Sequence, residues 1–404
     1  MDLLQENKKK NKKTTGQKII LTLLIISIIL IIAIVGVMLV MGNIGTKSKY
    51  TIAVNGNIVS EEKIGFLQLE DGSKYISIRA LCNQLNYEYF NGEYNIAGES
   101  KDKGYINNGT NIVQFFADSN DIYKTEENEV KDYEYYKLKN NIIQYNETLY
   151  INMEDLTVAF NLIEVYSEEK NQTIILTPEY WLEKNNAQFD ELGYTVSETP
   201  ENKKAISYGY VIIQNNEKYG VINLGLEELI GNKYNSINFV EYTGQFIVSN
   251  NNDKYGVINI NGSTEIALQY DSIEILNYNP LLYQVERLEE YGIMRQNGEI
   301  INEIKYTSLG YPEDKANNIY YTLIIPELNE NIPQSIVVCK DGKYGLVNLE
   351  NGKEIIPCNL KGIFKLIDID RGLEYYVVQY ENGNVTTLEN YVNSINQITA
   401  NINN

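Results

Sequence analysis

Histidine is absent from the 404 residues of this chain, and that absence excludes much chemistry. Without histidine there is no Ser/His/Asp or Cys/His catalytic group and no His-ligated metal site. The motifs of phosphate-binding loops, serine hydrolases, zinc proteases and EF-hands are missing as well. The sequence offers no catalytic, cofactor-binding or metal-binding residue, so we expect a protein that is not an enzyme and uses no cofactor.

Cysteine is scarce too, with Cys82, Cys339 and Cys358 as its three occurrences. Three cysteines are too few for a disulfide-based scaffold, and no C-x-x-C pair suggests a zinc or redox motif. Two interpretations stay open. Either one disulfide forms beside a free thiol, or three thiols are buried separately as small apolar side chains.

Positive charge is scarce everywhere except at the N-terminus. The net charge is −20, yet residues 1–18 carry six lysines against Asp2 and Glu6. Residues 19–46 carry no charge, so the negative charge lies almost entirely after them. A strongly acidic chain repels nucleic acid, which excludes nucleic-acid binding from our expectations.

An uncharged stretch at 19–41 predicts a transmembrane helix. As a helix its 23 residues would span about 35 Å, enough to cross a bilayer. A cleaved signal peptide would have a shorter apolar region and a small-residue cleavage site. With the basic tail 1–18 in the cytoplasm, the positive-inside rule puts the bulk of the chain outside, after a juxtamembrane linker at 42–50.

Residues 51–178 predict a duplicated α+β unit. Asn55-Gly56 lies between two apolar stretches, which favours a β-hairpin. A strand–helix–strand pattern from Tyr75 recurs 75 residues later from Tyr150. Matching positions are Tyr75 and Tyr150, Ile76 and Ile151, Leu81 and Leu156, and Asn86 and Asn161. Two half-modules of this kind indicate one compact domain.

The same residues resemble a known family. The letters V-N-G at 54–56, Y-I-S-I-R-A-L from Tyr75 and Y-I-N-M-E-D-L from Tyr150 are similar to the copper amine oxidase N-terminal-like stalk domain. This chain has Ser77 where that family has proline, and Glu154 where arginine is expected. The resemblance implies an accessory stalk of secreted and surface proteins, without a copper site.

A second periodicity covers 206–389. The motif K/E-Y-G recurs at Tyr219, Tyr255, Tyr291 and Tyr344, and a second marker follows each motif tyrosine by 15 residues, or by 16 in the last copy. The second markers are Tyr234, Tyr270, Tyr306 and Leu360. The interval before the last copy holds an insertion at 309–333. Such a period predicts a β-repeat array in which each unit packs on its neighbours, and the glycine permits a close approach or a bulge.

These repeats resemble the WG (KWG) β-repeat, whose hallmark is G-K-W/Y-G-x-I/V-D/N. The stretch D-G-K-Y-G-L-V-N at 341–348 matches best, with tyrosine in place of the usual tryptophan. We interpret the motif tyrosines as packing residues between units, although a row of aromatics could also stack on sugars. Variable loops, above all 309–333, are the better candidates for binding.

Two further side-chain groups are candidate sites. Asp368 and Asp370 would share a face of a strand, and paired carboxylates can do acid–base work or bind Ca²⁺. With 54 acidic residues in the chain such a pair arises by chance, so we assign it no role. Arg79 is a candidate for a buried ion pair, with a structural role as the favoured interpretation.

The predicted fold class is therefore a transmembrane helix, an α+β stalk-like domain and an all-β repeat array, either an open solenoid or propeller-like. A linker at 179–205 and a polar tail at 390–404 complete the organisation. We expect a bacterial single-pass membrane protein at the cell surface with a non-enzymatic binding or scaffold role, its partner a cell-wall polymer or another surface protein. The alternatives are a carboxylate-dependent cell-wall hydrolase and a membrane-linked sensor or assembly factor.

Overall fold

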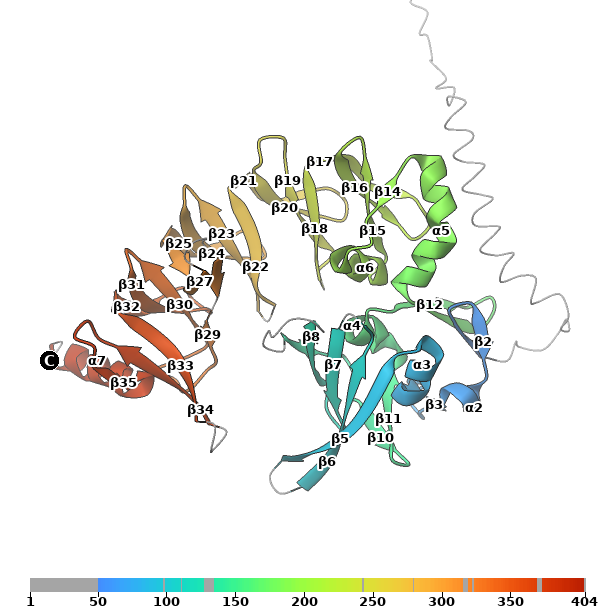
Figure 1. Ribbon diagram of the computed structural model, residues 1–404, viewed down its shortest axis with the longest axis horizontal. Coiled ribbons are helices and arrows are strands. Elements are labelled where there is room, and N and C mark those ends of the chain that lie inside the picture. Colours follow the sequence, from blue (N-terminus) through green and yellow to red (C-terminus); the bar gives the residue numbers. More distant parts are fainter. Residues whose placement is uncertain are drawn as a thin grey trace, which may run out of the picture. The chain divides into compact units, whose positions relative to one another are not determined.

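The computed structural model describes residues 50–96, 99–109, 111–126, 134–241, 243–278, 280–314, 319–321, 323–368 and 373–402 (Figure 1). The chain forms two compact units. Unit 1 extends to Lys233, and unit 2 runs from Tyr234 to the C-terminus. Each unit has its own cores.

The predicted fold class is wrong in two respects. The described residues are 54 % strand and 17 % helix, arranged in many small sheets, so the first domain is not a balanced α+β unit. In addition, none of the helices within the described residues is long and apolar enough to cross a membrane. The two longest have 15 residues each, about 22 Å, and both carry acidic side chains. The expected single-pass membrane helix is thus not found among the described residues. The predicted span 19–41, its tail 1–18 and most of the linker 42–50 lie outside the described residues.

A mixed four-stranded sheet opens unit 1. Its strands, in spatial order, are β12 (Ile163–Ser167), β13 (Gln172–Leu176), β1 (Thr51–Val54) and β2 (Asn57–Val59). The hairpin between β1 and β2 turns at Asn55 and Gly56, which both have positive φ, as the sequence predicts. Strand β1 pairs in parallel with β13, so the two ends of this module lie side by side.

The two matching half-modules pair directly with each other. Strand β4 (Lys74–Ser77) lies antiparallel to β11 (Thr148–Asn152), with Ile76 opposite Ile151, and β3 (Phe66–Gln68) and β10 (Ile143–Tyr145) flank them. Short helices follow each copy: α3 (Ile78–Leu85) after the first, and η1 (Met153–Asp155) with α4 (Leu156–Phe160) after the second. Both α3 and α4 end at an asparagine in the left-handed region, Asn86 and Asn161. One core joins both copies and helix α2 (Glu61–Ile64).

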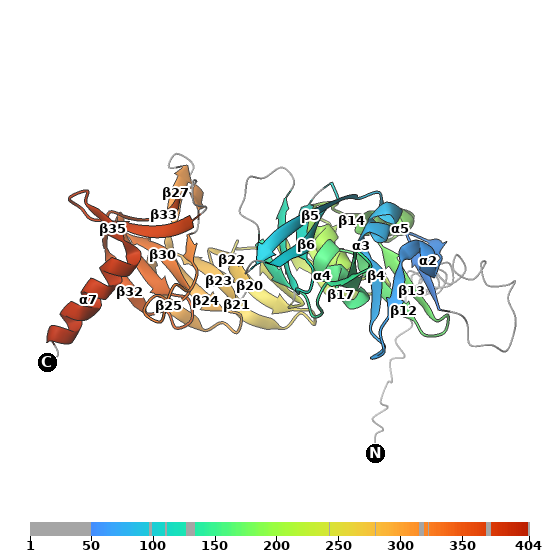
Figure 2. The same cartoon turned by 90° about the horizontal axis from the view of Figure 1, so that it is seen from below.

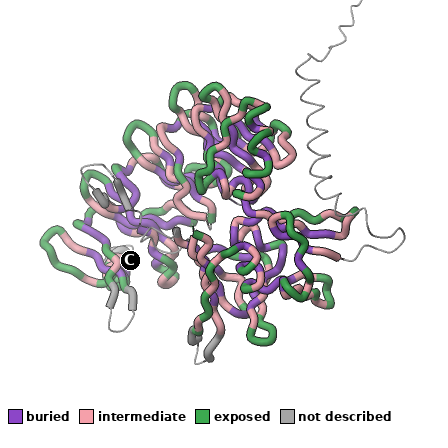
Figure 3. Tube along the Cα trace, turned by 45° about the vertical axis from the view of Figure 1, so that its right-hand side comes forward, coloured by how far each residue is buried: buried purple, intermediate pink, exposed green. Residues whose placement is uncertain are grey.

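Between the half-modules lies a five-stranded antiparallel meander, here called sheet C. It consists of β5 (Glu88–Ile96), β6 (Glu99–Asn107), β7 (Asn111–Phe116), β8 (Asp121–Glu126) and β9 (Glu134–Lys137) (Figures 1 and 2). Described residues along β7 and β8 alternate between buried and half-exposed. Figure 3 colours the whole described chain by burial. Ile106, Val113, Phe115 and Ile122 of one face belong to the module's core. This sheet is why the module is mostly β.

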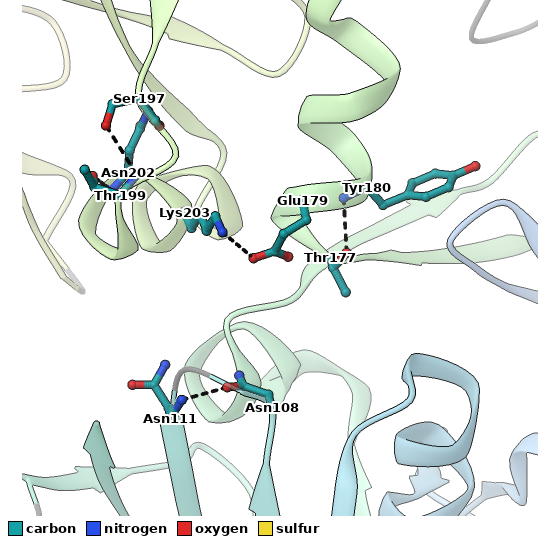
Figure 4. A network of polar contacts seen from close by, with 9 residues as sticks. All are labelled: Asn108, Asn111, Thr177, Glu179, Tyr180, Ser197, Thr199, Asn202 and Lys203. Carbon is teal, nitrogen blue, oxygen red and sulfur yellow. Dashed lines mark hydrogen bonds and ion pairs between the residues drawn. The ribbon is translucent and has the colours of Figure 1, made fainter. Parts of the chain in front are cut away.

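The segment predicted as a linker forms two helices. Helices α5 (Pro178–Leu192) and α6 (Pro200–Ser207) each begin with a threonine cap followed by proline, Thr177-Pro178 and Thr199-Pro200. The Lys203 ammonium lies 3.1 Å from the Glu179 carboxylate (Figure 4). Trp181 is buried in a core that includes Ile163 of the first module. The same core includes residues of the first repeat sheet, which is formed by β14 (Thr195–Val196), β15 (Tyr210–Asn215), β16 (Lys218–Asn223) and β17 (Glu228–Tyr234).

Unit 2 repeats a four-stranded antiparallel meander, the motif from which propeller blades are built. The first sheet contains β18 (Ser236–Val240), β19 (Gln245–Ser249), β20 (Tyr255–Asn259) and β21 (Thr264–Tyr270). The second contains β22 (Ser272–Tyr278), β23 (Leu281–Arg287), β24 (Glu290–Arg295) and β25 (Ile300–Tyr306). The third is built on β30 (Ser335–Lys340), β31 (Lys343–Asn348) and β32 (Glu354–Leu360), joined by β26 (Ser308–Leu309) and β29 (Ile324–Ile325).

The last sheet of unit 2 has three strands, β33 (Gly362–Asp368), β34 (Leu373–Gln379) and β35 (Val385–Thr387). The segment predicted as a polar tail from residue 390 belongs instead to helix α7 (Leu388–Ile402). This helix packs against β34 and β35 (Figures 1 and 2). Its residues Leu388 and Val392 join the same core as Ile363 and Val378. The helix therefore covers part of the last sheet's inner side.

The spacing of the two tyrosine markers has a simple structural cause. In each repeat of unit 2 the motif tyrosine lies directly opposite the second marker on the neighbouring strand, as Tyr255 lies opposite Tyr270. In the last copy Tyr344 lies opposite Leu360. The turn between these two strands runs from Asn348 to Lys353, one residue longer than the turn from Asn259 to Ser263. The longer turn accounts for the offset of 16.

The glycine after each motif tyrosine is required by a close approach. A register shift separates the tyrosine pair from the next pair, so the neighbouring strand bulges over the glycine. A Cβ on Gly256 would lie 2.5 Å from the Ile266 carbonyl oxygen, and one on Gly345 would lie 2.6 Å from that of Ile356. No side chain fits there, which confirms the expectation from the sequence.

Candidate binding surface

The recurring tyrosines of the repeats are part of the packing. The motif tyrosines Tyr219, Tyr255, Tyr291 and Tyr344 are all half-buried. Three of them pack against the successive cores of unit 2. The second-marker residues Tyr234, Tyr270, Tyr306 and Leu360 are buried. These residues define the repeat unit, as expected, and do not form an open row of rings.

Polar contacts link the second and third sheets of unit 2. The Tyr306 hydroxyl donates to the Glu354 carboxylate at 3.0 Å, and the Lys305 ammonium lies 3.0 Å from the same oxygen. The Asn302 amide donates to the Gly352 carbonyl at 2.7 Å. Burial is the main cause that raises the pKa of Tyr306, so this phenol stays protonated and acts as a donor. Adjacent repeats are therefore held by both apolar and directional contacts.

The insertion 309–333 supplies an aromatic side chain to the end of the array. It contains the hairpin of β27 (Tyr311–Asp314) and β28 (Ile319–Tyr321). The Tyr311 ring stacks on the motif residue Tyr344 at 4.3 Å and on Phe364 at 5.5 Å, between ring centroids. Its hydroxyl donates to the Ile363 carbonyl at 2.6 Å and accepts from the Ile363 backbone amide. The insertion thus fastens the last sheet to the third.

The outward side of the last sheet forms an apolar surface, which we call the terminal face. Cross-strand register places Phe364 opposite Val377 and Leu366 opposite Tyr375 on this side. Its exposed apolar side chains are Phe364, Leu366, Tyr375 and Val385, with 38, 41, 44 and 55 % of their surface accessible. Val377, Gln379 and Thr387 complete the side chains described on this face. None of the described side chains on it is charged.

The equivalent side of each earlier sheet in unit 2 is covered by the next sheet. In the first sheet, Ile247 and Val257 pack on Tyr283 and Val285 of the second. Leu282 and Ile293 on the other side of the second sheet pack with Ile336 and Val338 of the third. Val337 and Leu346 of the third sheet then pack with Ile363 and Val378 of the last. The terminal face is the next surface in this series.

The other side chains weighed from the sequence do not converge on a site. Arg79 is exposed on α3 with its guanidinium carbon 5.0 Å from the centre of the Tyr89 ring, so it is not in a buried ion pair. Asp370 lies outside the described residues, as does the side chain of Asp368. Among the residues that the structure describes, no group of three His, Cys, Asp or Glu side chains could hold a metal ion.

The three cysteines are free thiols. Cys82 and Cys339 are buried, and Cys358 is partly buried. Desolvation is the main cause that raises the pKa of Cys82 to about 12 and that of Cys358 to about 11. Cys82 and Cys358 therefore stay protonated at neutral pH and behave as small apolar side chains. The interpretation with three separate thiols is the one the structure supports.

Comparison with known proteins assigns no family. No family model matches the chain, and no curated protein matches it. Among solved structures, BBS1N in complex with ARL6DN covers 73 % of this chain and 89 % of its own length at 10 % identity, with a TM-score of 0.23. The match with Hsv2 from Kluyveromyces lactis covers 69 % of this chain and 96 % of Hsv2, at 8 % identity and a TM-score of 0.25. The match with the tricorn protease covers 83 % of this chain and 38 % of that protein, at 11 % identity and a TM-score of 0.23. Similarity this low carries neither a fold nor a function to this chain. The resemblances to the stalk domain and the WG repeat stay predictions.

Proposed function

We propose that this chain is a non-enzymatic scaffold protein whose repeat array joins a second copy of the chain end to end through the terminal face. The single observation that carries the proposal is the terminal face itself. It continues the sheet-on-sheet series of unit 2, yet beyond the Tyr311 ring that stacks on Phe364 no further sheet of the described chain covers it. Two such faces placed against each other would form a further sheet-on-sheet contact.

The chemistry of the face supports association with a like surface. A twofold contact is self-complementary, so each side chain meets the same kind of surface on the partner copy. The chain carries a net charge of −20, and two copies repel each other at long range. Because the described side chains of the terminal face are aromatic, aliphatic or uncharged, the contact would bury no like-charge pair among them. Association should therefore strengthen as salt screens the long-range repulsion.

The terminal face also suits a scaffold better than a catalyst. Its aromatic side chains offer apolar area at low conformational cost, which is what interface centres use. The exposed area is small, so the contact should be weak and depend on protein concentration. In a repeat protein an end of this kind would normally be covered by a polar cap. The side chains of the terminal face depart from that rule.

The test is sedimentation velocity of the full chain over a wide range of concentration and salt. We expect reversible dimers that Leu366→Asp with Tyr375→Asp abolishes, because each new carboxylate would be buried in the contact. Leu288→Asp is the matched control, since Leu288 is an exposed leucine at a turn of the second sheet with 80 % of its surface accessible. A wild-type chain that stays monomeric, or a dimer that survives the terminal-face substitutions, would overturn the proposal.

A further inference from the structure

The outward face of sheet C carries a cross-strand row of aromatic residues that the repeats do not share. Paired register places Phe90, Tyr105, Gln114, Tyr123 and Tyr135 side by side, one from each of the five strands. Phe90 and Tyr135, at the two edges, have 55 % and 39 % of their surface accessible. We call these five residues the aromatic row. With strands about 4.8 Å apart, it is about 19 Å long.

Ring contacts hold the aromatic row in place. The centroids of Tyr123 and Tyr135 lie 5.7 Å apart with the rings at 60°, and Phe116 meets Tyr123 at 5.8 Å and 90°. The Tyr135 hydroxyl donates to the Asp121 carboxylate at 2.7 Å. At the other end, the Lys103 ammonium lies 5.2 Å from the centre of the Tyr105 ring. The rings therefore form a preordered, corrugated surface, which lowers the entropy cost of binding.

Two glycines of sheet C leave room for side chains of the neighbouring strands. Gly92 is paired with Lys103, and a Cβ there would lie 3.0 Å from the lysine side chain. The lysine side chain can therefore cross the strand beside Tyr105. On the core face of the same sheet, Gly104 makes room for the Phe115 ring, since a Cβ there would lie 2.4 Å from that ring. Gly92 thus leaves room for Lys103 on the outer face, and Gly104 leaves room for Phe115 on the core face.

Polar groups surround the rings and balance in charge. Gln114 stands in the middle of the row, between rings on both sides. Lys137 is paired with Asp121, and Lys103 and Glu88 lie on the same side of the sheet. Among the side chains described on this face the opposite charges are equal in number. A neutral ligand fits this balance, whereas a polyanion such as nucleic acid would meet carboxylates in a chain of net charge −20.

We infer that the aromatic row is a binding platform for a neutral, extended glycan. The flat C–H faces of sugar rings pack on aromatic faces, and sugar hydroxyl groups need donors and acceptors beside those rings. The row supplies both, because the amide of Gln114 and the tyrosine hydroxyl groups lie among its four rings. Apolar protein surfaces fit it less well, since every apolar contact along the row would lie beside an amide, a phenol or a charged group. The inference rests on unit 1 and is independent of the proposed function.

The test is isothermal titration calorimetry of the full chain with cellohexaose and chitohexaose, both neutral β-linked glycans. We expect binding to at least one of them, and a loss of about tenfold or more in affinity in both Phe90→Ala and Tyr135→Ala. The matched control is Tyr145→Ala, which removes an exposed tyrosine from another sheet of the same unit. The control should bind as the wild type does.

Three outcomes would overturn the inference. The first is a wild-type chain that binds neither hexasaccharide. The second is unchanged affinity in Phe90→Ala and Tyr135→Ala, both of which alter exposed edge positions and should leave the thermal unfolding midpoint nearly unchanged. The third is binding of anionic hyaluronan oligosaccharides or a thymidine oligonucleotide in preference to the neutral glycans. Dimerisation through the terminal face should be unaffected by either variant, so failure here is distinct from failure of the scaffold proposal.

Discussion

The repeat sheets of unit 2 and sheet C of unit 1 are both antiparallel and both rich in tyrosine. Their tyrosines have different structural roles. In unit 2 the cross-strand pair Tyr291 and Tyr306 packs between neighbouring sheets, and Tyr306 is fully buried. In sheet C the cross-strand pair Tyr123 and Tyr135 lies on the face away from the core. Residue type and strand pairing are the same in both places.

The difference lies in the neighbouring layer. A strand sends alternate side chains to opposite faces, so a tyrosine becomes core or surface according to whether a second layer covers its face. In unit 2 each sheet is followed by another, up to the terminal face. Sheet C has a core on one face, and its other face keeps rings partly exposed. Periodicity in sequence therefore indicates tyrosines that build the repeat, whereas cross-strand placement identifies tyrosines available for binding.

The largest expected effect comes from the buried tyrosine. Tyr306→Ala should destabilise unit 2 by about 4 kcal/mol, because it leaves a large cavity and removes the donor to Glu354. Tyr135→Ala should cost less than about 1 kcal/mol, because its ring is partly exposed. Urea unfolding of both variants checks the contrast. Equal costs at the two positions would break it.

The next effect tests the glycine of the Tyr-Gly motif. Gly345→Ala should cost about 3 kcal/mol, because the new methyl group would lie 2.6 Å from the Ile356 carbonyl oxygen and the bulge would have to open. Gly231→Ala is the control, since the nearest atom to its Cβ is a flexible Glu228 oxygen at 3.4 Å. Urea unfolding measures both. A Gly345→Ala chain as stable as the control would show that the close approach is not required.

A smaller effect concerns the hydroxyl of Tyr311. Tyr311→Phe keeps the stack between Tyr344 and Phe364 but removes the contacts with the Ile363 backbone. We expect a cost of about 1 kcal/mol. Hydrogen exchange of β33 should rise in the variant, whereas exchange in β18 to β21 should not change. If β33 exchanges at the wild-type rate, the insertion does not fasten the last sheet.

The last effect is a pH-dependent reaction rate and involves no change in stability. Because the pKa of Cys358 is raised to about 11, its thiolate fraction at pH 8 is about 100-fold below that of a thiol of pKa 9. Alkylation of the native chain should be slow at pH 8 and should rise about tenfold per pH unit up to pH 10. Cys82, buried in unit 1 with a pKa of about 12, should react more slowly still. Mass spectrometry gives both rates, and fewer than three reactive thiols after unfolding would reveal a disulfide.

Local signals in the sequence predicted the elements that depend on them. Asn55-Gly56 predicted its hairpin, and the two repeated markers predicted a β-repeat array, whereas the pairing of the markers and the longer turn in the last copy came from the structure. The caps Thr177-Pro178 and Thr199-Pro200 were also local signals for helices, yet the polar composition of 179–205 favoured a linker. The apolar residues Leu388 and Val392 could likewise have predicted helix α7.

Other features depend on contacts between distant residues. Nothing local to β1 indicates its parallel pairing with β13, more than a hundred residues later. The aromatic row combines residues from Phe90 to Tyr135, and only the register of five strands brings them together. The terminal face can be recognised only once the structure shows that no described sheet follows β33 to β35. Both candidate binding surfaces were therefore out of reach of the sequence alone.

Hydroxyl-radical footprinting of the full chain, read residue by residue by mass spectrometry, tests the contrast between the two sets of aromatics most directly. Phe90 and Tyr135 of sheet C should oxidise quickly, and Tyr283 and Tyr306 of unit 2 should be protected until the chain unfolds. Oxidation of Tyr306 as fast as that of Tyr135, or protection of Phe90 and Tyr135 in the isolated protein, would contradict the account.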